Sequence, residues 1–128
     1  MTTRSVQAEG GCHCGAVRFC VSFDAPPTLL DCNCSICAKT GYLHLIVAAT
    51  AFEILSGADA LTDYRFGTGT ARHLFCRHCG IKSFYVPRSH PGGFSVNWRA
   101  LDGVAGIIPR IAPFDGAGWE RARAALAE

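Results

Sequence analysis

The chain has 128 residues, of which 49% are hydrophobic and 17% are charged, and its formal net charge is +2. This length predicts a single domain over residues 1–128, and the small net charge, without Lys and Arg gathered on one face, argues against nucleic-acid binding. No apolar run approaches the roughly 20 residues of a membrane helix, and residues 1–10 lack the apolar segment of a signal peptide. We therefore expect a cytoplasmic protein without a membrane partner.

Strand signals dominate the pattern. Residues 16–23 alternate, and their apolar side chains fall on one face: Val17, Phe19, Val21 and Phe23. Further short strands are predicted, in chain order, over residues 43–49, 52–55, 61–66, 72–76, 81–86 and 94–98. The segments 72–76 and 81–86 are expected to flank a turn as two arms of a hairpin. Residues 87–93, rich in Pro and Gly, predict a loop.

Helix is predicted in only two places. One turn over residues 35–39 would have Ser35 as its N-cap. The Ala-rich segment 119–127 predicts an amphipathic helix with Trp119, Ala122 and Leu126 roughly on one face, which would cover an edge of a sheet. The pattern as a whole predicts a mainly β domain of short antiparallel strands with a C-terminal helix.

Seven of the eight cysteines stand two or three residues from another cysteine, which in a reducing compartment favours metal over disulfides. Cys76 and Cys79 flank a turn closed by Gly80, so both sulfur atoms point at one place, as in a zinc knuckle. A redox pair of the thioredoxin kind would begin a helix. Strands are predicted on both sides here, so zinc is favoured.

Cys12 and Cys14 form a second chelating pair. In extended chain, residues two apart point to the same side, whereas a disulfide across so small a ring would be strained. The pair needs two more ligands, and Cys76 with Cys79 is their natural source. We expect a closed four-thiolate zinc site, with His13 exposed or beside the site but not a ligand.

Cys32, Cys34 and Cys37 form the other cluster, and three thiolates from six residues can reach one ion. Three protein ligands with a position left for water or substrate is the pattern of a reactive zinc. The alternative is that a protein side chain fills that position, with three candidates: His44, His73 and Asp31. The eighth cysteine, Cys20, is expected in mid-strand opposite the Val/Phe face as a small, partly buried residue.

Other residues carry weaker signals. His90 could face a pocket, although an exposed loop position is the commoner case, and Asn97 or Arg99 could line a site while Trp98 is equally a core aromatic. A loose basic cluster is interpreted as solvated strand and loop surface; its members are Arg65, Arg72, Arg77 and Lys82.

With these residues in view, the chain resembles the glutathione-dependent formaldehyde-activating enzyme family, which also includes the centromere protein V branch. The matching stretches are GGCHCGAVRF at 10–19, DCNCSIC at 31–37 and FCRHCG at 75–80, and the segments 87–94 and 101–102 are similar to the same branch. The resemblance spans about residues 6–121 and includes seven cysteines that match in type, order and spacing.

The resemblance implies a zinc-stapled β-tent, with small antiparallel sheets arranged around two zinc ions. It implies a structural zinc on Cys12, Cys14, Cys76 and Cys79. It also implies a catalytic zinc held by three residues: Cys32, Cys34 and Cys37. The activity implied is the addition of glutathione to formaldehyde, formally that of a carbon–sulfur lyase of the S-hydroxymethylglutathione-synthase kind, with a small thiol as partner.

Two functions stay open at this point. In the first, a zinc held by three thiolates binds a substrate thiol in its deprotonated form, and that thiolate attacks a small carbonyl held close by. In the second, the protein is a non-catalytic module whose second zinc stabilises a partner-binding surface. A methionine sulfoxide reductase on a similar scaffold is disfavoured, because its nucleophile would have to be Cys20, which has no activating charge nearby.

Overall fold

The computed structural model describes residues 4–90 and 92–118. The helix predicted over 119–127 lies outside the described residues. Within them, the strands form a three-stranded, a five-stranded and a two-stranded sheet, and the helix α1 (Ser35–Thr40) accompanies short 3-10 turns. The mainly β prediction is confirmed. No helix in the described part of the chain is long and apolar enough to cross a membrane.

The first sheet has the order β1-β2-β5 and is antiparallel throughout; its strands are β1 (Arg4–Gly11), β2 (Arg18–Ala25) and β5 (Phe52–Ser56). The alternation predicted along β2 is confirmed. Phe19, Val21 and Phe23 are buried, whereas Ser22 and Asp24 are exposed. The buried face of this sheet therefore supplies one wall of the core.

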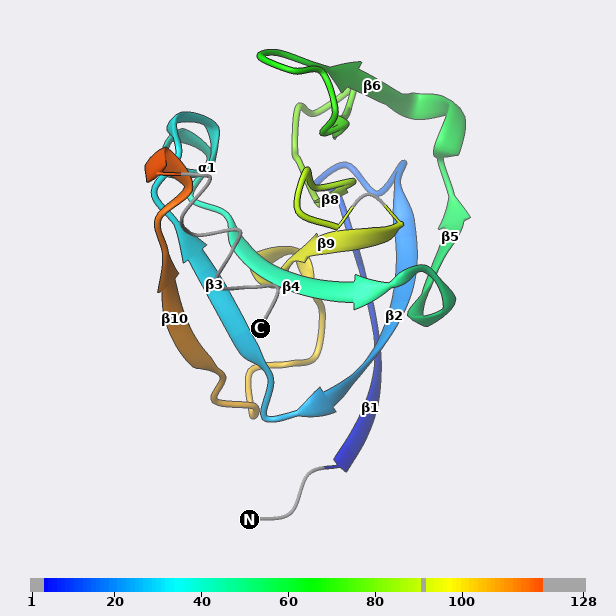
Figure 1. The fold of residues 1–128 in the computed structure, drawn as a ribbon. Coiled ribbons are helices and arrows are strands. Elements are labelled where there is room, and N and C mark those ends of the chain that lie inside the picture. The colour runs from blue at the N-terminus through cyan, green and yellow to red at the C-terminus, as the bar shows by residue number, and fades with distance from the viewer. Residues whose placement is uncertain (1–3, 91, 119–128) are drawn as a thin grey trace.

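The second sheet has the order β10-β3-β4-β9-β8 (Figure 1), with the strands β3 (Thr28–Cys32), β4 (Leu43–Ala48), β8 (Phe84–Tyr85), β9 (Gly93–Asn97) and β10 (Arg110–Phe114). The third sheet pairs β6 (Leu61–Tyr64) with β7 (His73–Cys76). The 3-10 turns are η1 (Ala49–Ala51), η2 (Ala58–Ala60), η3 (Trp98–Ala100) and η4 (Gly116–Gly118).

Aromatic rings join the first two sheets across the core. The ring of Phe52 on β5 lies 5.2 Å from Phe19 on β2, 4.8 Å from Phe84 on β8 and 4.3 Å from Phe94 on β9. Such ring pairs stabilise beyond the apolar area that they bury. The core thus lies between the two sheets and holds Phe84 of β8 in place. Tyr85, the next residue of β8, lines the candidate site.

One strand pair departs from the predicted antiparallel pattern. β10 pairs with β3 in parallel, from Arg110 opposite Thr28 to Phe114 opposite Cys32. Parallel neighbours need a long connection, and here most of the fold intervenes between the two strands. β1, β3 and β10 were not predicted, because their alternation is weak. Since β3 and β10 end together (Figure 1), the residues after Phe114 come to lie beside Cys32.

The hairpin predicted around the Cys76–Cys79 turn forms only in part: the two arms are bridged antiparallel at Arg72 and Val86, but their ladders run to other strands. β7 pairs with β6, and β8 pairs with β9. The bridge of Arg72 to Val86 and a bond from Cys76 N–H to the Ile81 carbonyl link the backbones of the two predicted arms. The helix α1 begins at Ser35, but its N-cap is Cys34, in extended backbone, rather than Ser35. This shift brings Cys34 to the helix entrance.

Candidate metal centres and active-site pocket

Four cysteines from two distant parts of the chain meet at one point. The sulfur atoms of Cys12, Cys14, Cys76 and Cys79 all lie within 4.8 Å of one another. The Cys14 sulfur is 3.6 Å from both the Cys12 and the Cys76 sulfur, and none of these residues forms a disulfide. The four-cysteine group predicted from spacing is therefore assembled by the fold.

Backbone N–H groups surround this four-cysteine group. The N–H of Val17 donates to the Cys12 sulfur at 3.3 Å, and that of His78 donates to the Cys76 sulfur at 3.4 Å. Gly80, with φ of +77°, closes the turn after Cys79. Burial raises the pKa of the Cys79 thiol, but N–H donors from Cys14 and Ile81 outweigh it and lower this pKa to about 6. Such donors favour thiolates, the form that ligates metals.

The second group consists of Cys32, Cys34 and Cys37, whose sulfur atoms also lie within 4.8 Å of one another. Cys32 ends β3, Cys34 caps α1 and Cys37 lies inside α1, where only 3% of it is exposed. A hydrogen bond from Cys37 is the largest influence that lowers the pKa of Cys32, to about 6; the Cys34 and Gly116 N–H groups act in the same direction. The same bond and burial raise the pKa of Cys37. Without a metal, hydrogen bonds between the thiols hold the three sulfur atoms together. A bound divalent metal ion would displace the protons of those thiols.

Gly116 permits the close approach of η4 to this three-cysteine group. A Cβ placed there would overlap the Cys32 sulfur and would lie 2.9 Å from Cβ of Cys34. The parallel pairing of β10 with β3 delivers this glycine to the site, and the Asn33 N–H bond to the Phe114 carbonyl at 3.1 Å fastens the two segments. The sequence gives no signal for this role.

His44 on β4 supports the three-cysteine group from behind. Its Nε2 lies 3.2 Å from the Cys37 sulfur, and its Nδ1 lies 2.8 Å from Oγ of Ser95 and 3.3 Å from the hydroxyl of Tyr85. Burial, with the charge of Lys82 second, lowers the pKa of His44 to about 3, so the ring is neutral. In the tautomer with the proton on Nε2, His44 would donate to the Cys37 sulfur while the two hydroxyls donate to Nδ1.

The three alternative ligands do not join the sulfur atoms. His44 contacts Cys37 but falls outside the atoms that lie within 4.8 Å of one another, as do His73 and Asp31. Asp31 is exposed on β3, and His73 lines another wall of the neighbouring cavity.

A cavity of about 180 Å³ opens onto the three-cysteine group. Its polar lining comes from several elements, and the rest is largely apolar. The lining residues are Leu30, Cys32, Cys34, Ile36, Cys37, His44, Ile46, Phe66, Gly67, Thr68, Ala71, His73, Tyr85, Pro87, Arg88, Ser89, Phe114 and Gly116. No residue of the four-cysteine group is among them. A concave, mostly apolar pocket with a few convergent polar groups is the usual form of a small-molecule site.

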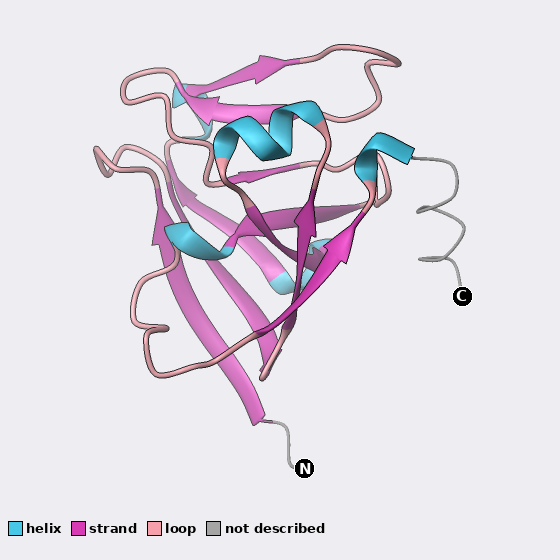
Figure 2. Ribbon diagram, turned by 90° about the vertical axis from the view of Figure 1, so that its left-hand side faces the viewer, coloured by secondary structure: helices cyan, strands magenta, loops and turns pink. Residues whose placement is uncertain are grey.

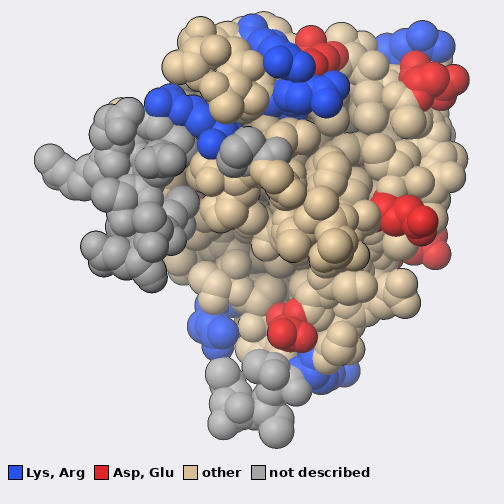
Figure 3. All heavy atoms as spheres, turned by 45° about the vertical axis from the view of Figure 1, so that its right-hand side comes forward, with Lys and Arg blue, Asp and Glu red and all other residues tan. Residues whose placement is uncertain are grey.

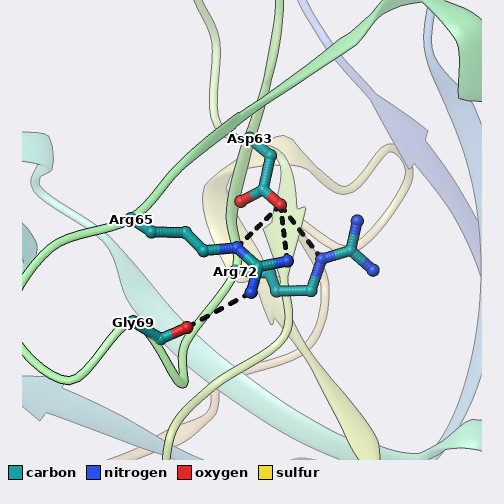
Figure 4. A network of polar contacts seen from close by, with 4 residues as sticks. All are labelled: Asp63, Arg65, Gly69 and Arg72. Carbon is teal, nitrogen blue, oxygen red and sulfur yellow. Dashed lines mark hydrogen bonds and ion pairs between the residues drawn. The ribbon is translucent and has the colours of Figure 1, made fainter.

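The β6–β7 connection forms one rim of this pocket. Asp63 accepts hydrogen bonds from Nε of Arg65 at 3.0 Å and from Nε of Arg72 at 3.1 Å, and Arg65 also donates to the Gly69 carbonyl at 3.3 Å (Figure 4). One carboxylate thus fastens both ends of the loop that carries Phe66 into the pocket. In Figure 2, α1 lies beneath this hairpin, and Tyr64 and Phe66 share a shallow hollow with it.

The interpretation of the basic cluster as solvated surface is wrong for one member. Arg65, Arg72 and Arg77 are exposed, but Lys82 is 8% exposed, with Nζ 2.8 Å from Nδ1 of His73. Several Lys and Arg side chains lie near the upper edge of the face in Figure 3, at the height of β6 in Figure 1. Lys82 stands two residues before the core residue Phe84, and this spacing is a signal that could have indicated its burial.

The weaker candidates take no part in the pocket lining. His90 bonds Ser89 through Nδ1, the Asn97 side chain caps η3 by accepting from Arg99 N–H, and Trp98 packs edge-on against Phe23. His13 is exposed, as expected. Cys20 is partly buried on β2 with its sulfur 3.8 Å from Glu53, outside both cysteine groups.

The arrangement has a counterpart among known proteins. A model of the family described as glutathione-dependent formaldehyde-activating enzyme matches residues 7–116 of this chain. The chain belongs to this family. The matched segment contains both cysteine groups and every residue that lines the pocket.

Two relatives of this family member can be compared directly. A Halomonas elongata protein, provisionally named a glutathione-dependent formaldehyde-activating enzyme, is 35% identical over 79 residues, which are 56% of this chain and 50% of that protein. The chain thus spans about half the length of this curated relative. A crystal structure of a Rhodobacter sphaeroides protein is 35% identical, with a TM-score of 0.72, and the alignment covers 81% of this chain and 99% of that one.

In this member of the family, both cysteine groups could each hold one metal ion. Thiolates are soft ligands that suit zinc and disfavour magnesium or calcium, and backbone N–H or imidazole donors lie against both groups. The donor sets are therefore compatible with zinc.

Proposed function

We propose that this protein is a zinc-dependent enzyme that joins a thiol such as glutathione to a small carbonyl such as formaldehyde, formally a carbon–sulfur lyase. The observation that carries the proposal is an asymmetry between the two cysteine groups. Cys32, Cys34 and Cys37 line the pocket, whereas the four-cysteine group does not. A catalytic zinc keeps three protein ligands and one position for substrate, whereas a structural zinc takes four.

The two groups would then have different tasks. Cys12, Cys14, Cys76 and Cys79 would hold a structural zinc that joins the β1–β2 connection to the end of β7. The other three would hold the catalytic zinc. Zinc bound there would keep a substrate thiol deprotonated at neutral pH. The family description and the name of the Halomonas relative support glutathione as that thiol.

The chain's own residues would prepare the pocket for this reaction. His44, with Nε2 3.2 Å from the Cys37 sulfur, would donate to it in the Nε2-protonated tautomer and hold it in place. Apolar side chains from three elements exclude water from the cavity: Leu30, Ile36 and Ile46. Holding the thiol and the carbonyl together in such a cavity removes much of the entropic cost of a bimolecular reaction. Lys82, buried behind His73, offsets the negative charge of three thiolates.

Cobalt substitution tests the proposal. Protein purified without chelator should contain close to two zincs per chain. In the cobalt-loaded protein, glutathione should raise the thiolate-to-cobalt charge-transfer intensity, and the tetrahedral bands should persist. Cys37→Ser should abolish this response, whereas Cys20→Ser, the matched cysteine outside both groups, should keep it.

Formaldehyde is then added, and adduct formation should be faster than with glutathione alone at the same pH. A response to another small thiol but not to glutathione would keep the chemistry and change the substrate. No response to any thiol would contradict the enzyme and favour the zinc-stabilised interaction module.

A further inference from the structure

A buried lysine stands behind the pocket without a carboxylate partner among the described residues. The Nζ of Lys82 lies 3.9 Å from the ring centre of Tyr85 and 5.2 Å from that of Tyr42, and it contacts Nδ1 of His73 at 2.8 Å. A buried ammonium is costly unless it is paired. The hydrogen bond to His73 therefore offsets part of the cost of burying the Lys82 ammonium.

His73 connects this lysine to the pocket. Its ring lies between Phe66, at 5.1 Å and 18°, and Tyr85, at 5.0 Å and 16°, so stacking on both faces fixes its plane. With Lys82 charged, its ammonium donates a hydrogen bond to Nδ1, so the proton of the neutral His73 ring sits on Nε2. The ring lines the pocket, and no residue in the described ranges bonds Nε2.

We propose that Lys82 and His73 form a proton relay that delivers a proton to an oxyanion formed in the pocket. The inference rests on the proposed function and supplies the proton that this addition requires. His73 would be the catalytic residue that touches the reacting oxygen, and Lys82 the residue behind it that orients His73 and replaces its proton.

The step balances in atoms and charge. The thiolate sulfur forms a bond to the carbonyl carbon, and the π electrons of the C=O bond move to oxygen. The proton on Nε2 of His73 passes to that oxygen, while a proton of the Lys82 ammonium passes to Nδ1. The products are a hydroxyl group, a neutral imidazole protonated on Nδ1 and a neutral amine. The proton that the thiol released on becoming a thiolate returns through solvent to Nε2, the Nδ1 proton returns to Lys82, and the reverse reaction uses the same path.

The electrostatics of the pair suit this role. Burial lowers the pKa of Lys82 to about 8, while the thiols of Cys37, Cys34 and Cys32 act in the opposite direction. Burial, with Lys82 second, lowers the pKa of His73 to about 4, and Asp63 opposes this weakly. At neutral pH the lysine is therefore charged and the histidine neutral. A proton donor with a pKa near the working pH is the most effective general acid.

Tyr85 lines the same pocket and is the competing donor. Its hydroxyl already lies 3.3 Å from Nδ1 of His44, and burial raises its pKa. Both features oppose release of its proton, so the structure favours His73.

The kinetic test compares adduct formation by the zinc-loaded protein and its variants. His73→Phe keeps a ring between Phe66 and Tyr85 but removes the relay, and it should lose about 100-fold in kcat with an unchanged cobalt response to glutathione. His90→Phe, outside the pocket, is the matched control and should keep the wild-type rate.

Lys82→Arg distinguishes proton donation by Lys82 from its orientation of the His73 ring. Arginine keeps the charge and can bond Nδ1, but it does not release its proton at these pH values, so the rate should fall as far as in Lys82→Met. Lys39→Met, an exposed lysine of α1, is the control and should stay active. A full rate in His73→Phe or in Lys82→Arg overturns the relay. No acceleration by the wild-type protein overturns the proposed function and the relay with it.

A spectroscopic readout is independent of turnover. In ¹⁵N-labelled zinc-loaded protein, the ring nitrogens of His73 should show a neutral imidazole protonated on Nε2 at pH 7. Lys82→Met should lose this tautomer preference and Lys82→Arg should retain it. A His73 ring protonated on Nδ1, or on both nitrogens, in the wild-type protein at pH 7 overturns the relay.

Discussion

Nε2 of His44 lies 3.2 Å from the sulfur of Cys37, so an imidazole on the central β4 strand supports a thiol on α1. Replacement of His44 by Phe keeps a ring in the core but removes the N–H donor. Loss of such a partner typically lowers metal affinity 10–100-fold. Competition with a chromophoric chelator should show that weakening at the three-cysteine group only. His13→Phe is the control, and equal weakening at both groups would contradict this role.

The two cysteine groups should differ in what they stabilise. Cys76→Ser should unfold or precipitate the protein, because a structural zinc contributes about 10–16 kcal/mol to folding and Cys76 is fully buried. Cys37→Ser should leave a folded chain with weak metal binding at the second group. Circular dichroism and metal analysis measure both effects, and equal loss of structure would refute the division.

Gly116→Ala should damage the three-cysteine group specifically. The added methyl group would overlap the Cys32 sulfur and lie close to Cys34, so the variant should bind one zinc in place of two. Gly106→Ala is the matched control, since a Cβ there meets no atom within 4 Å. Unchanged zinc content in Gly116→Ala would show that η4 can move away without cost to the site.

Cys20→Ala should leave both metals in place. The Cys20 side chain is only partly buried and its sulfur lies 3.8 Å from Glu53, so the expected loss of stability is about 1 kcal/mol. Urea unfolding and zinc analysis measure the two quantities. A missing zinc in this variant would identify Cys20 as a ligand that the described geometry does not indicate.

The buried Lys82 predicts a pH dependence of stability. Burial lowers its pKa from 10.5 to about 8. Between these pH values the unfolded chain still binds the proton that the folded chain has released, so the free energy of unfolding rises with pH, by up to about 3 kcal/mol. Below pH 8 both states are protonated and the contribution is flat.

Urea unfolding of the zinc-loaded protein from pH 8 to 10.5 measures this slope. The wild-type protein should show a steeper rise than Lys82→Met, while Lys39→Met should follow the wild type. Parallel curves for the wild type and Lys82→Met would mean that the lysine is not buried as a cation.

The sequence by itself determined the local chemistry of the metal groups. Two cysteines separated by one or two residues bring their sulfur atoms together whatever the rest of the chain does, because chelation at this spacing depends on a few backbone torsions. The alternation along β2 is likewise local, and the burial of Phe19 and Val21 confirms it. These features could be predicted because each depends on neighbours within a few residues.

Only the tertiary structure decided which group faces a pocket and what stands behind it. Cys14 meets Cys76 across 62 residues, and the parallel β10, which carries Gly116 to Cys32, bonds β3 across 82 residues from Arg110 to Thr28. His44 and Lys82 acquire their roles through burial against residues from other strands. Strand pairing and burial depend on long-range contacts that leave only weak marks in a single sequence, so the pocket, its histidines and its lysine emerge only when the chain is folded.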